Sequence, residues 1–369
     1  MERILCIVDS LNTGGAETFL MKLRRALEKD KYQIDFISSD KGYYDEEVIN
    51  NGGLVHYIPF RTKKPITSFI MIKNIVKCGD YNIVIKLGST PIAAIDLLAA
   101  KKGGAKILGL RSCNSFAEEG FIYKTINVIC RPLLKSVVNL KIAPSDLAAI
   151  FTFGEQAYKN KEVNILHNAV DLDYFKFDKI KRSETRKLLG ISEGDTVYGH
   201  IGRFSNQKNH TFLIDIFKNI KDKDDNAKFV LVGTGELESQ IKNKVKNYGL
   251  SNDVLFLGVR DDIPNLLSAF DLFVFPSFYE GMPNTVVEAQ ATGLPCIISD
   301  TITRQSNITG LVDFLSIDLP AEDWAEKCVN HNKKRVNTTN ILQKSGYNID
   351  IIVKDFLKMT VGDKCDNKY

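Results

Sequence analysis

Short runs of branched and aromatic residues alternate, along the first half of the chain, with stretches whose apolar residues recur every three to four positions. The runs predict buried strands, because such side chains fill both faces of a covered sheet. These runs are Ile4–Val8, Gln33–Ser38, Ile83–Ile85, Lys106–Leu110 and Leu140–Ala143. The periodic stretches predict helices, for example over Glu17–Leu27 and Ile66–Lys77. Strands that alternate with helices indicate a parallel sheet with right-handed crossovers.

The same pattern begins again in the second half of the chain. Its expected strands are Thr196–Ile201, Lys228–Val232, Val254–Leu257, Leu272–Phe275 and Cys296–Ser299. Its expected helices are His210–Ile220, Leu237–Tyr248, Ile263–Ala269 and Thr285–Thr292. The fold class is therefore α/β, with two Rossmann-like, doubly wound parallel-sheet domains joined by a hinge near Leu166–Asp173. Ligands of such sheets bind beyond the carboxyl ends of the strands, so two facing domains predict an interdomain cleft as the site.

The domain bounds follow from these elements. We expect a first domain over 1–168, a second over 169–345, and a C-terminal helix within 346–360 that packs back toward the first domain. The polar tail, 361–369, is expected to be disordered. A length of 369 residues is enough for two domains that each have a core of their own.

Composition and charge narrow the class of partner. The formal net charge is only +4, which gives no basis for a nucleic-acid partner. The charge is uneven, since residues 1–170 hold 23 Lys and Arg against 17 Asp and Glu. A basic first half favours an anionic substrate or an anionic membrane surface, and an ordinary solvated surface is an equal alternative.

The cysteines and the apolar runs bear on the compartment. The seven cysteines are scattered without a C-x-x-C pair, so neither a disulfide framework nor a zinc site is expected. The run Ile4–Val8 is too short for a signal peptide, and no stretch reaches the ~18 apolar residues that span a bilayer. We therefore expect a cytoplasmic protein, and leave open whether it touches the cytoplasmic face of a membrane.

Gly14 and Gly15 follow the first expected strand, at the point where a helix is expected to begin. Glycines allow close backbone approach, and a helix N-terminus presents free N–H groups and the positive end of its dipole. The turn suits a phosphate or a sugar hydroxyl, although it lacks the G-x-G-x-x-G spacing of a dinucleotide fingerprint. A tight turn without any ligand explains the two glycines equally well.

Two cations follow the strand Thr196–Ile201. Gly202 lets the chain turn, and Arg203 and Lys208 lie just past the carboxyl end of the strand. Arginine offers a planar fork for phosphate oxygens, and lysine offers a point charge. A leaving nucleoside diphosphate gains negative charge as its bond to the sugar breaks, so fixed cations lower that barrier and can substitute for a metal. Exposed surface cations are the alternative, and the position at a strand end favours binding.

Two glutamates flank the next strand-to-helix junction. Glu280 lies in the loop after Leu272–Phe275, and Glu288 lies about one turn inside the helix that follows. Gly281 keeps the loop open, and Pro283 marks a helix start whose N-terminus can hold a phosphate. Carboxylates only accept hydrogen bonds, so they suit the adjacent hydroxyls of a ribose or a hexose.

Together these motifs resemble those of the retaining nucleotide-sugar transferases of glycosyltransferase family 4, which have the GT-B fold. The resemblance extends over nearly the whole chain. It rests on Gly14–Glu17, Asn168–Asp171, Gly202-Arg203 with Lys208-Asn209, Val232–Gly235, Gly258–Arg260 and the E-x7-E pair Glu280/Glu288. The segments Ser299–Thr303 and Ile308-Thr309 are similar to those of capsular and exopolysaccharide members.

The resemblance implies a role for each motif. The first domain would bind the acceptor and the second the donor. Arg203 and Lys208 would bind the donor diphosphate, Glu288 the ribose and Glu280 the transferred sugar, which makes Glu280, Arg203 and Lys208 the expected catalytic residues. The other expected donor contacts are Gly258, Val259 and Arg260 at the base, the backbone at Gly281, Met282, Pro283, Asn284 and Thr285, and Gly14 and Gly15. The family also implies retention of configuration, a nucleotide-diphosphate sugar as co-substrate, and no obligatory metal or other cofactor.

One segment departs from the family. Related sequences usually carry a histidine after the fourth strand of the first domain, near the donor sugar. This chain has Arg111-Ser112-Cys113-Asn114 there. Arg111 and Asn114 are therefore candidate contacts to the sugar or the acceptor, and a structural Arg111 or a different acceptor pocket is the alternative.

Three other features of the sequence could belong to a functional site but also have a structural explanation. Asp171 and Asp173 spell the D-x-D metal motif of a different transferase fold, but they lie at the hinge, so no metal site is expected. His167 is expected to pack at the hinge and His200 in the core. The segment Phe121–Lys141 combines apolar residues with Lys124, Arg131, Lys135 and Lys141. It could rest on an anionic membrane or be buried against the sheet, and the polyprenyl-linked acceptor suggested by the resemblance adds weight to the membrane.

The leading hypothesis is a hexosyltransferase of surface-polysaccharide assembly. It would move a hexose or N-acetylhexosamine from a nucleotide sugar, with a UDP-sugar favoured, to a glycan or polyprenyl-linked glycan acceptor. One alternative is a GT-B-fold nucleotide-sugar 2-epimerase, which needs no acceptor; the cations combined with E-x7-E argue against it. The other is a non-catalytic nucleotide-sugar-binding partner of another transferase, which the altered Arg111–Cys113 segment leaves open.

Overall fold

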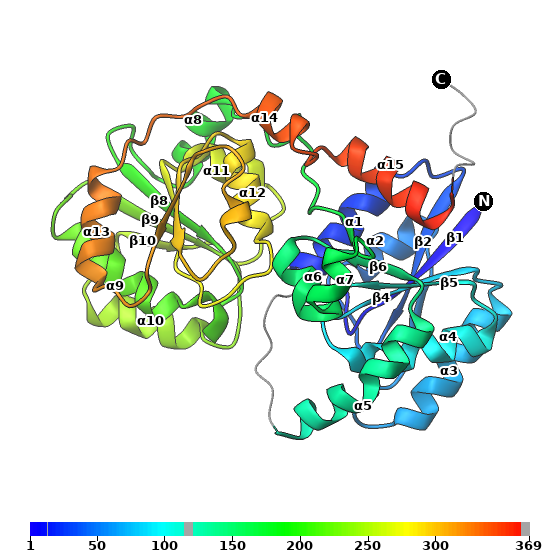
Figure 1. Cartoon of the computed structure of the whole chain (residues 1–369). Coiled ribbons are helices and arrows are strands. Elements are labelled where there is room, and N and C mark those ends of the chain that lie inside the picture. The colour runs from blue at the N-terminus through cyan, green and yellow to red at the C-terminus, as the bar shows by residue number, and fades with distance from the viewer. Residues whose placement is uncertain (13, 114–120, 363–369) are drawn as a thin grey trace. The chain divides into compact units, whose positions relative to one another are not determined.

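The computed structural model describes residues 1–12, 14–113 and 121–362, in two compact units (Figure 1). Unit 1 comprises Met1–Ala169 and the residues from Ile349 onward, and unit 2 comprises Val170–Asn348. The chain passes into unit 2 inside the segment Leu166–Asp173 that the sequence indicates as the hinge. From residue 363 on, the tail expected at 361–369 lies outside the described residues.

A parallel sheet of seven strands forms the middle layer of the described part of unit 1, in the order β3-β2-β1-β4-β5-β6-β7. The strands are β1 (Glu2–Ile7), β2 (Tyr32–Ser38), β3 (Val55–Tyr57), β4 (Ile83–Leu87), β5 (Ile107–Arg111), β6 (Leu140–Ala143) and β7 (Asn164–Ile165). The chain winds from β1 out to β3 and then returns to β4. The topological switch point of this sheet therefore lies between β1 and β4.

Helices cover both faces of this sheet. They are α1 (Gly15–Ala26), α2 (Asp45–Asn50), α3 (Pro65–Cys78), α4 (Ala94–Gly103), α5 (Phe121–Val137), α6 (Asp146–Phe153), α7 (Glu155–Lys159) and α15 (Ile349–Thr360), with the short 3-10 helix η1 (Pro91–Ala93). Successive side chains of a strand point to opposite faces. Ile4 and Cys6 of β1 accordingly join the core under α1, whereas Leu5 and Ile7 join the core under α3 and α4.

The helix α15 belongs to unit 1, although it follows unit 2 in the chain. Ile352, Phe356 and Leu357 are buried in the core that contains Phe19 and Leu20 of α1. Its apolar residues at three- to four-residue spacing form the stripe that packs there.

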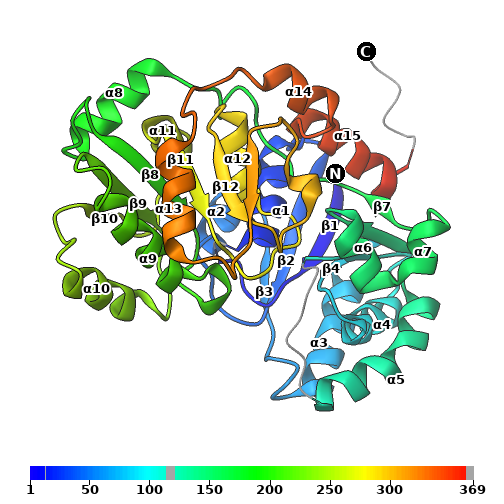
Figure 2. The same ribbon diagram turned by 60° about the vertical axis from the view of Figure 1, so that its left-hand side comes forward.

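Unit 2 repeats the architecture with a six-stranded parallel sheet in the order β10-β9-β8-β11-β12-β13 (Figure 2). The strands are β8 (Thr196–Ile201), β9 (Ala227–Val232), β10 (Val254–Phe256), β11 (Leu272–Phe275), β12 (Cys296–Ser299) and β13 (Val312–Leu315). The helices are α8 (Lys179–Leu188), α9 (His210–Lys221), α10 (Glu238–Asn247), α11 (Ile263–Ala269), α12 (Asn284–Ala291), α13 (Ala321–Asn330) and α14 (Thr339–Lys344), with the 3-10 helices η2 (Asn206–Lys208) and η3 (Arg304–Ser306). The switch point lies between β8 and β11, where Tyr198 pairs with Leu272.

Every strand expected from the sequence is present, and no strand end differs from its expected position by more than two residues. Three strands, β3, β7 and β13, are not among those expected from the sequence. These three strands are short and lie at the edges of the two sheets. An edge strand needs only backbone pairing with one neighbour, so it leaves no long apolar run in the sequence.

Among the described residues, no helix combines the length with the apolar character that crossing a membrane requires.

The segment between α13 and α14 is anchored in unit 2 by Arg335. Its guanidinium donates to the carbonyl oxygens of Leu267 at 2.5 Å and Phe270 at 2.6 Å, and to that of Thr292 at 2.8 Å. It also lies 4.4 Å from the centroid of the Phe177 ring. The last carbonyls of a helix have no partner within the helix, so Arg335 satisfies acceptors that α11 leaves open.

Replacing Arg335 by methionine should therefore lower the free energy of unfolding by roughly 2–3 kcal/mol, because several acceptors lose a charged donor. Urea titration measures the effect. Lys334→Met is the matched control, since Lys334 is the exposed neighbour of Arg335 in the same segment. Equal midpoints for the two variants would contradict the anchoring role.

Candidate active site

The expected binding residues of unit 2 follow neighbouring strands at the switch point of its sheet. The segment 202–209 leaves the carboxyl end of β8, and the segment 276–283 leaves that of β11. Because β8 and β11 are adjacent and parallel, both segments begin at the same edge of the sheet. Ligands of doubly wound sheets bind at this edge.

Lys208 and Glu280 form an ion pair across these two segments. The Nζ atom of Lys208 lies 2.6 Å from Oε1 of Glu280, and the two side chains are only 18% and 12% exposed. The same ammonium lies 4.6 Å from the centroid of the Phe275 ring, which adds a cation–π contact. Partial burial strengthens such a pair, because less water screens it. The structure thus brings together two of the three expected catalytic side chains.

Gln207 joins the same two segments. Its side-chain Nε2 donates to the carbonyl oxygen of Tyr279 at 2.9 Å and to Oε1 of Glu280 at 3.2 Å. Its backbone carbonyl accepts from the N–H of Phe278 at 2.9 Å. Gln207 is not among the residues expected from the sequence, where the only signal for it is a polar residue beside Lys208.

The third expected catalytic residue, Arg203, has a different partner. One Nη atom of Arg203 lies 3.0 Å from Oε2 of Glu236, which follows β9. The two side chains are 72% and 52% exposed. An exposed pair of this kind contributes little to stability, so a ligand can displace Glu236 from Arg203 at small cost.

Glycines hold the ends of β8, β9 and β10 together. Gly233 has a φ of 126°, and a Cβ atom there would lie 2.2 Å from the carbonyl oxygen of Gly202. Only glycine allows this approach. The N–H of Gly233 donates to the carbonyl oxygen of Gly258 at 2.8 Å. The expected base-contacting residues therefore begin at the same edge as Gly202, with Val259 41% exposed and Arg260 paired with Asp262 at 2.7 Å.

The helix α12 begins at this edge as well. Pro283 occupies its N-cap, so the positive end of the helix dipole is presented next to the loop of Glu280. Met282 is buried, and its side chain packs in the core of unit 2. Glu288 lies inside the helix and is only 6% exposed. The remaining expected contacts, Gly281, Asn284 and Thr285, lie in the same loop and first turn.

Gly14 and Gly15 lie in unit 1, at the start of α1. Gly14 is the N-cap, and both glycines are exposed. The carboxylate of Glu17 folds back over Gly14, where a Cβ atom would lie 2.3 Å from Oε2. Burial raises the pKa of Glu17, and Asp9 contributes in the same direction.

Arg111 lies in the interior of unit 1. Its side chain is 2% exposed, its guanidinium lies 3.8 Å from the centroid of the Phe19 ring, and an Nη atom donates to Oδ1 of Asn168 at 2.7 Å. Burial lowers the pKa of Arg111 to about 10. These contacts give Arg111 a packing role beside the hinge, and its contact with a sugar stays a prediction. The other candidate, Asn114, lies outside the described residues.

The hinge residues have local structural partners. Oδ1 of Asp171 accepts from the backbone N–H groups of Asp173 at 3.2 Å and Tyr174 at 2.9 Å, which closes a turn. His167 places Nδ1 3.1 Å from the carbonyl oxygen of Pro144. In the described residues, no group of three or more His, Cys, Asp or Glu side chains is arranged to hold a metal ion.

Two buried histidines lie beneath Lys208. His200 is 0% exposed, which confirms its predicted place in the core, and its Nδ1 lies 2.9 Å from the carbonyl oxygen of Val274. The ring of His210 lies 4.8 Å from that of His200 and stacks on Phe204 at 4.2 Å. Burial lowers the pKa of both imidazoles, to about 3 for His210, and the charge of Lys208 adds to the effect.

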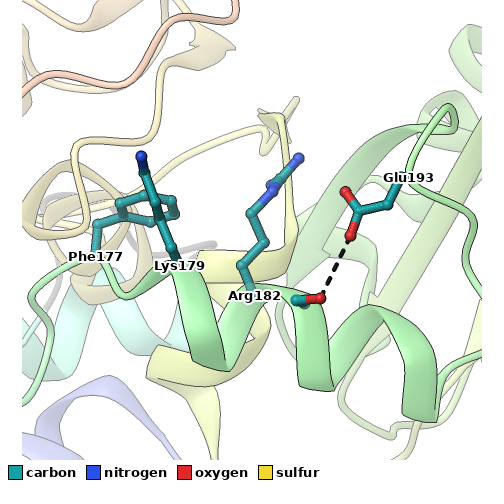
Figure 3. Close-up of a pocket in the computed structure, with 5 residues that line it drawn as sticks. Phe177, Lys179, Arg182 and Glu193 are labelled. Atoms are coloured by element: carbon teal, nitrogen blue, oxygen red, sulfur yellow. Dashed lines mark hydrogen bonds between the residues drawn. The ribbon is translucent and has the colours of Figure 1, made fainter.

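A shallow cavity of about 280 Å³ lies elsewhere in unit 2, along α8 (Figure 3). It is lined by Phe177, Lys179, Arg182, Ser183 and Glu193. Arg182 donates to Asp271, the residue that precedes β11. The cavity is therefore at the amino ends of the strands, at the edge opposite Lys208 and Glu280. None of the expected binding residues lines it.

Comparison with known sequences shows that this chain is similar to glycosyltransferases. A family model described as "Glycosyl transferases group 1" matches residues 181–315. The chain is 35% identical over 332 residues to "Putative glycosyltransferase EpsF" of Bacillus subtilis, covering 88% of this chain and 86% of that protein. It is 28% identical to "UDP-Gal:alpha-D-GlcNAc-diphosphoundecaprenol alpha-1,3-galactosyltransferase" of Escherichia coli, covering 78% of this chain and 76% of that protein.

Solved structures resemble the chain over almost its full length. The complex of Anabaena Alr3699/HepE with UDP-glucose has a TM-score of 0.78 at 20% identity, covering 97% of this chain and 99% of that one. Sucrose-phosphate synthase from Thermosynechococcus elongatus has a TM-score of 0.75 at 17% identity, covering 97% and 98%. At these identities the likeness concerns the fold alone, and it confirms the GT-B fold expected from the sequence.

The buried histidines predict a pH dependence of stability. The pKa of a histidine in the unfolded chain is about 6.5, whereas burial lowers the pKa of His210 in the folded protein to about 3. Between these two pH values the unfolded chain binds the extra proton, so acidification favours unfolding. The unfolding free energy should fall by up to about 1.4 kcal/mol per pH unit from His210 alone.

Urea unfolding of the unsubstituted protein and of His210→Phe, at about pH 7.5 and about pH 4.5, measures this contribution. The variant should lose less stability on acidification, because carboxylates titrate equally in both proteins. The same loss in both proteins would show that His210 is not buried in its neutral form.

Proposed function

Because the chain belongs to the group 1 glycosyl transferases, we propose that it moves a hexose or N-acetylhexosamine from a UDP-sugar to a lipid-linked polysaccharide precursor. Further parts of the proposal are membership of family 4 and retention of the anomeric configuration. The observation that carries it is the Lys208–Glu280 ion pair at the switch point of unit 2.

Each part of a nucleotide sugar has a matching group in unit 2. Lys208 and Arg203 supply the cations for the diphosphate, next to the N-terminus of α12. Glu288 would accept hydrogen bonds from the ribose hydroxyls. The backbone turn at Gly258, with φ of 65°, would lie against the base.

The chemistry follows from where charge develops. As the bond between the anomeric carbon and the diphosphate breaks, the leaving oxygens become more negative, and fixed cations stabilise them most in that state. Lys208 changes partner when the donor binds, from Glu280 to the phosphate. The freed carboxylate of Glu280 then accepts hydrogen bonds from the transferred sugar. No metal or further cofactor is obligatory in this proposal, because Arg203 and Lys208 supply the positive charge.

The choice of donor and acceptor is supported by what related proteins are named for. The relative from Escherichia coli is named as a galactosyltransferase that takes UDP-Gal and a diphosphoundecaprenol-linked acceptor. A protein from Erwinia amylovora, 23% identical over 86% of this chain, is named for amylovoran biosynthesis. A UDP-sugar and a polyprenyl-linked glycan are therefore the donor and the acceptor proposed here.

A lipid-linked acceptor places the enzyme at the cytoplasmic face of a membrane, and unit 1 has a surface suited to that contact. Ile66 and Ile70, one turn apart on α3, are 75% and 50% exposed. Exposed Lys63 and Lys64 precede them, and the segment from Phe60 to Cys78 contains no acidic residue. Exposed apolar groups flanked by cations bind anionic bilayers.

The neighbouring helix α5 has the same character. Figure 1 shows α3, α4 and α5 together on one side of the unit 1 sheet. Val128 is 69% exposed, and Arg131 and Lys135 are exposed. The side chains of residues 121–127 and 129, including Lys124, lie outside those described. The proposed membrane surface thus comprises α3 and the described part of α5.

The transfer reaction is tested with UDP-, GDP- and ADP-hexoses and a polyprenyl-diphosphate-linked sugar, with product followed by chromatography. We expect transfer from the UDP-sugar. Glu280→Ala and the isosteric Glu280→Gln should lower kcat by a factor on the order of 10²–10³, because the transferred sugar loses the carboxylate that accepts its hydrogen bonds.

Glu184→Ala is the control, since Glu184 is an exposed glutamate of α8 in the same unit. Thermal unfolding of each variant shows that it remains folded. Full activity of both Glu280 variants would refute the role of Glu280. Conversion of the donor to its 2-epimer without an acceptor would instead support an epimerase.

Membrane contact is tested by sedimentation with vesicles of phosphatidylglycerol and of phosphatidylcholine. The protein should bind the anionic vesicles, and the double variant Ile66→Ser/Ile70→Ser should bind at least about fivefold less, because it loses the exposed apolar contact. Ile180→Ser is the matched control, since Ile180 is 70% exposed but lies in unit 2. Undiminished binding by the double variant would exclude the α3 surface.

A further inference from the structure

Two hydrogen-bond donors contact the same carboxylate oxygen in the candidate active site. Oε1 of Glu280 accepts from Nζ of Lys208 at 2.6 Å and from Nε2 of Gln207 at 3.2 Å. The two donors are neighbours in η2, but they differ in charge. The ammonium is attracted to phosphate, whereas the neutral amide gains much less from a phosphate anion.

Gln207 bonds to three consecutive residues of the segment after β11. Its backbone carbonyl accepts from Phe278, and its side-chain amide donates to the carbonyl of Tyr279 and to the carboxylate of Glu280. One amide nitrogen carries two hydrogens, so it can make both side-chain bonds at once. The backbone bond sets the distance between the two loops, and the side chain sets the direction of Glu280.

The hydrogen bond from Gln207 to Glu280 becomes more important once Lys208 binds the diphosphate of the nucleotide sugar. Loss of the ammonium would leave Glu280 with one fewer bond at the moment when its carboxylate must be held against the transferred sugar. A misplacement of about 1 Å can lower the rate on the order of 10²-fold, because reacting groups must be aligned.

We propose that Gln207 is a positioning residue that keeps Glu280 directed at the transferred sugar after Lys208 has moved to the donor diphosphate. This inference rests on the proposed function. It assigns binding of the nucleoside diphosphate and orientation of the sugar to different side chains of the same short helix η2.

The two roles can be separated by kinetics. Gln207→Met keeps the length of the side chain and the backbone bond to Phe278, and it removes both side-chain donors. The variant should show a kcat lower by about tenfold, because only the orientation of the sugar is impaired. The dissociation constant for UDP, measured by calorimetry, should change by less than about twofold, because UDP lacks the transferred sugar.

A second variant tests the charge of the contact. Gln207→Glu places a carboxylate beside Glu280, and two close carboxylates do not both ionise readily. Its kcat should fall as the pH rises and the shared proton is lost, a trend that Gln207→Met should not show. Among the described residues, the charged or titratable groups near this position are Glu280 and Lys208, with His200 and His210 beneath Lys208.

Gln240→Met provides the control, since Gln240 is an exposed glutamine of α10 in the same unit. Thermal unfolding confirms that each variant is folded, and Gln207→Asn, which keeps the amide on a shorter chain, serves if the methionine variant is not. An unchanged kcat in Gln207→Met would overturn the proposal. Equal losses of kcat and UDP affinity would overturn it too, because they indicate a general disturbance of the loop. Lack of transfer by the unsubstituted protein would instead refute the proposed function.

Discussion

The ion pair between Lys208 and Glu280 is the contact on which the arrangement of the site depends. It joins the loops after β8 and β11, the two strands that flank the switch point of the unit 2 sheet. A departing diphosphate requires a cation, and the transferred sugar requires a hydrogen-bond acceptor. Because these two groups are each other's partner before the donor binds, neither leaves a charge uncompensated in a partly buried place.

The side chains beneath the Lys208–Glu280 pair are uncharged rings that pack against it. The ring of Phe275 and the imidazoles of His200 and His210 lie on the sheet side, and burial keeps both imidazoles neutral. A second cation there would repel Lys208. Gly233 allows the β9 loop to touch Gly202, which brings the expected base-contacting residues to the same edge.

The sequence indicated candidate residues for the chemistry, but not the contacts that these residues make. Arg203, Lys208 and Glu280 were candidates because they lie in the segments that follow strong apolar runs, and strand ends can be recognised locally. The pairing of Arg203 with Glu236 and the interior position of Arg111 were not predictable, because they depend on side-chain directions in the folded units. Gln207 was not expected for the same reason, since its side chain bonds to Tyr279 and Glu280, which are 72 and 73 residues away in the chain.

The sequence by itself determined the class of fold, two doubly wound α/β units, and the strand ends that the candidate binding residues follow. Apolar runs and helical periodicity are local properties, so no distant residue is needed to recognise them. Only the tertiary structure decided which polar groups meet, which residues of α15 enter the core of unit 1, and where the short edge strands lie. These outcomes depend on contacts between distant segments, and the local pattern of residues does not encode such pairings.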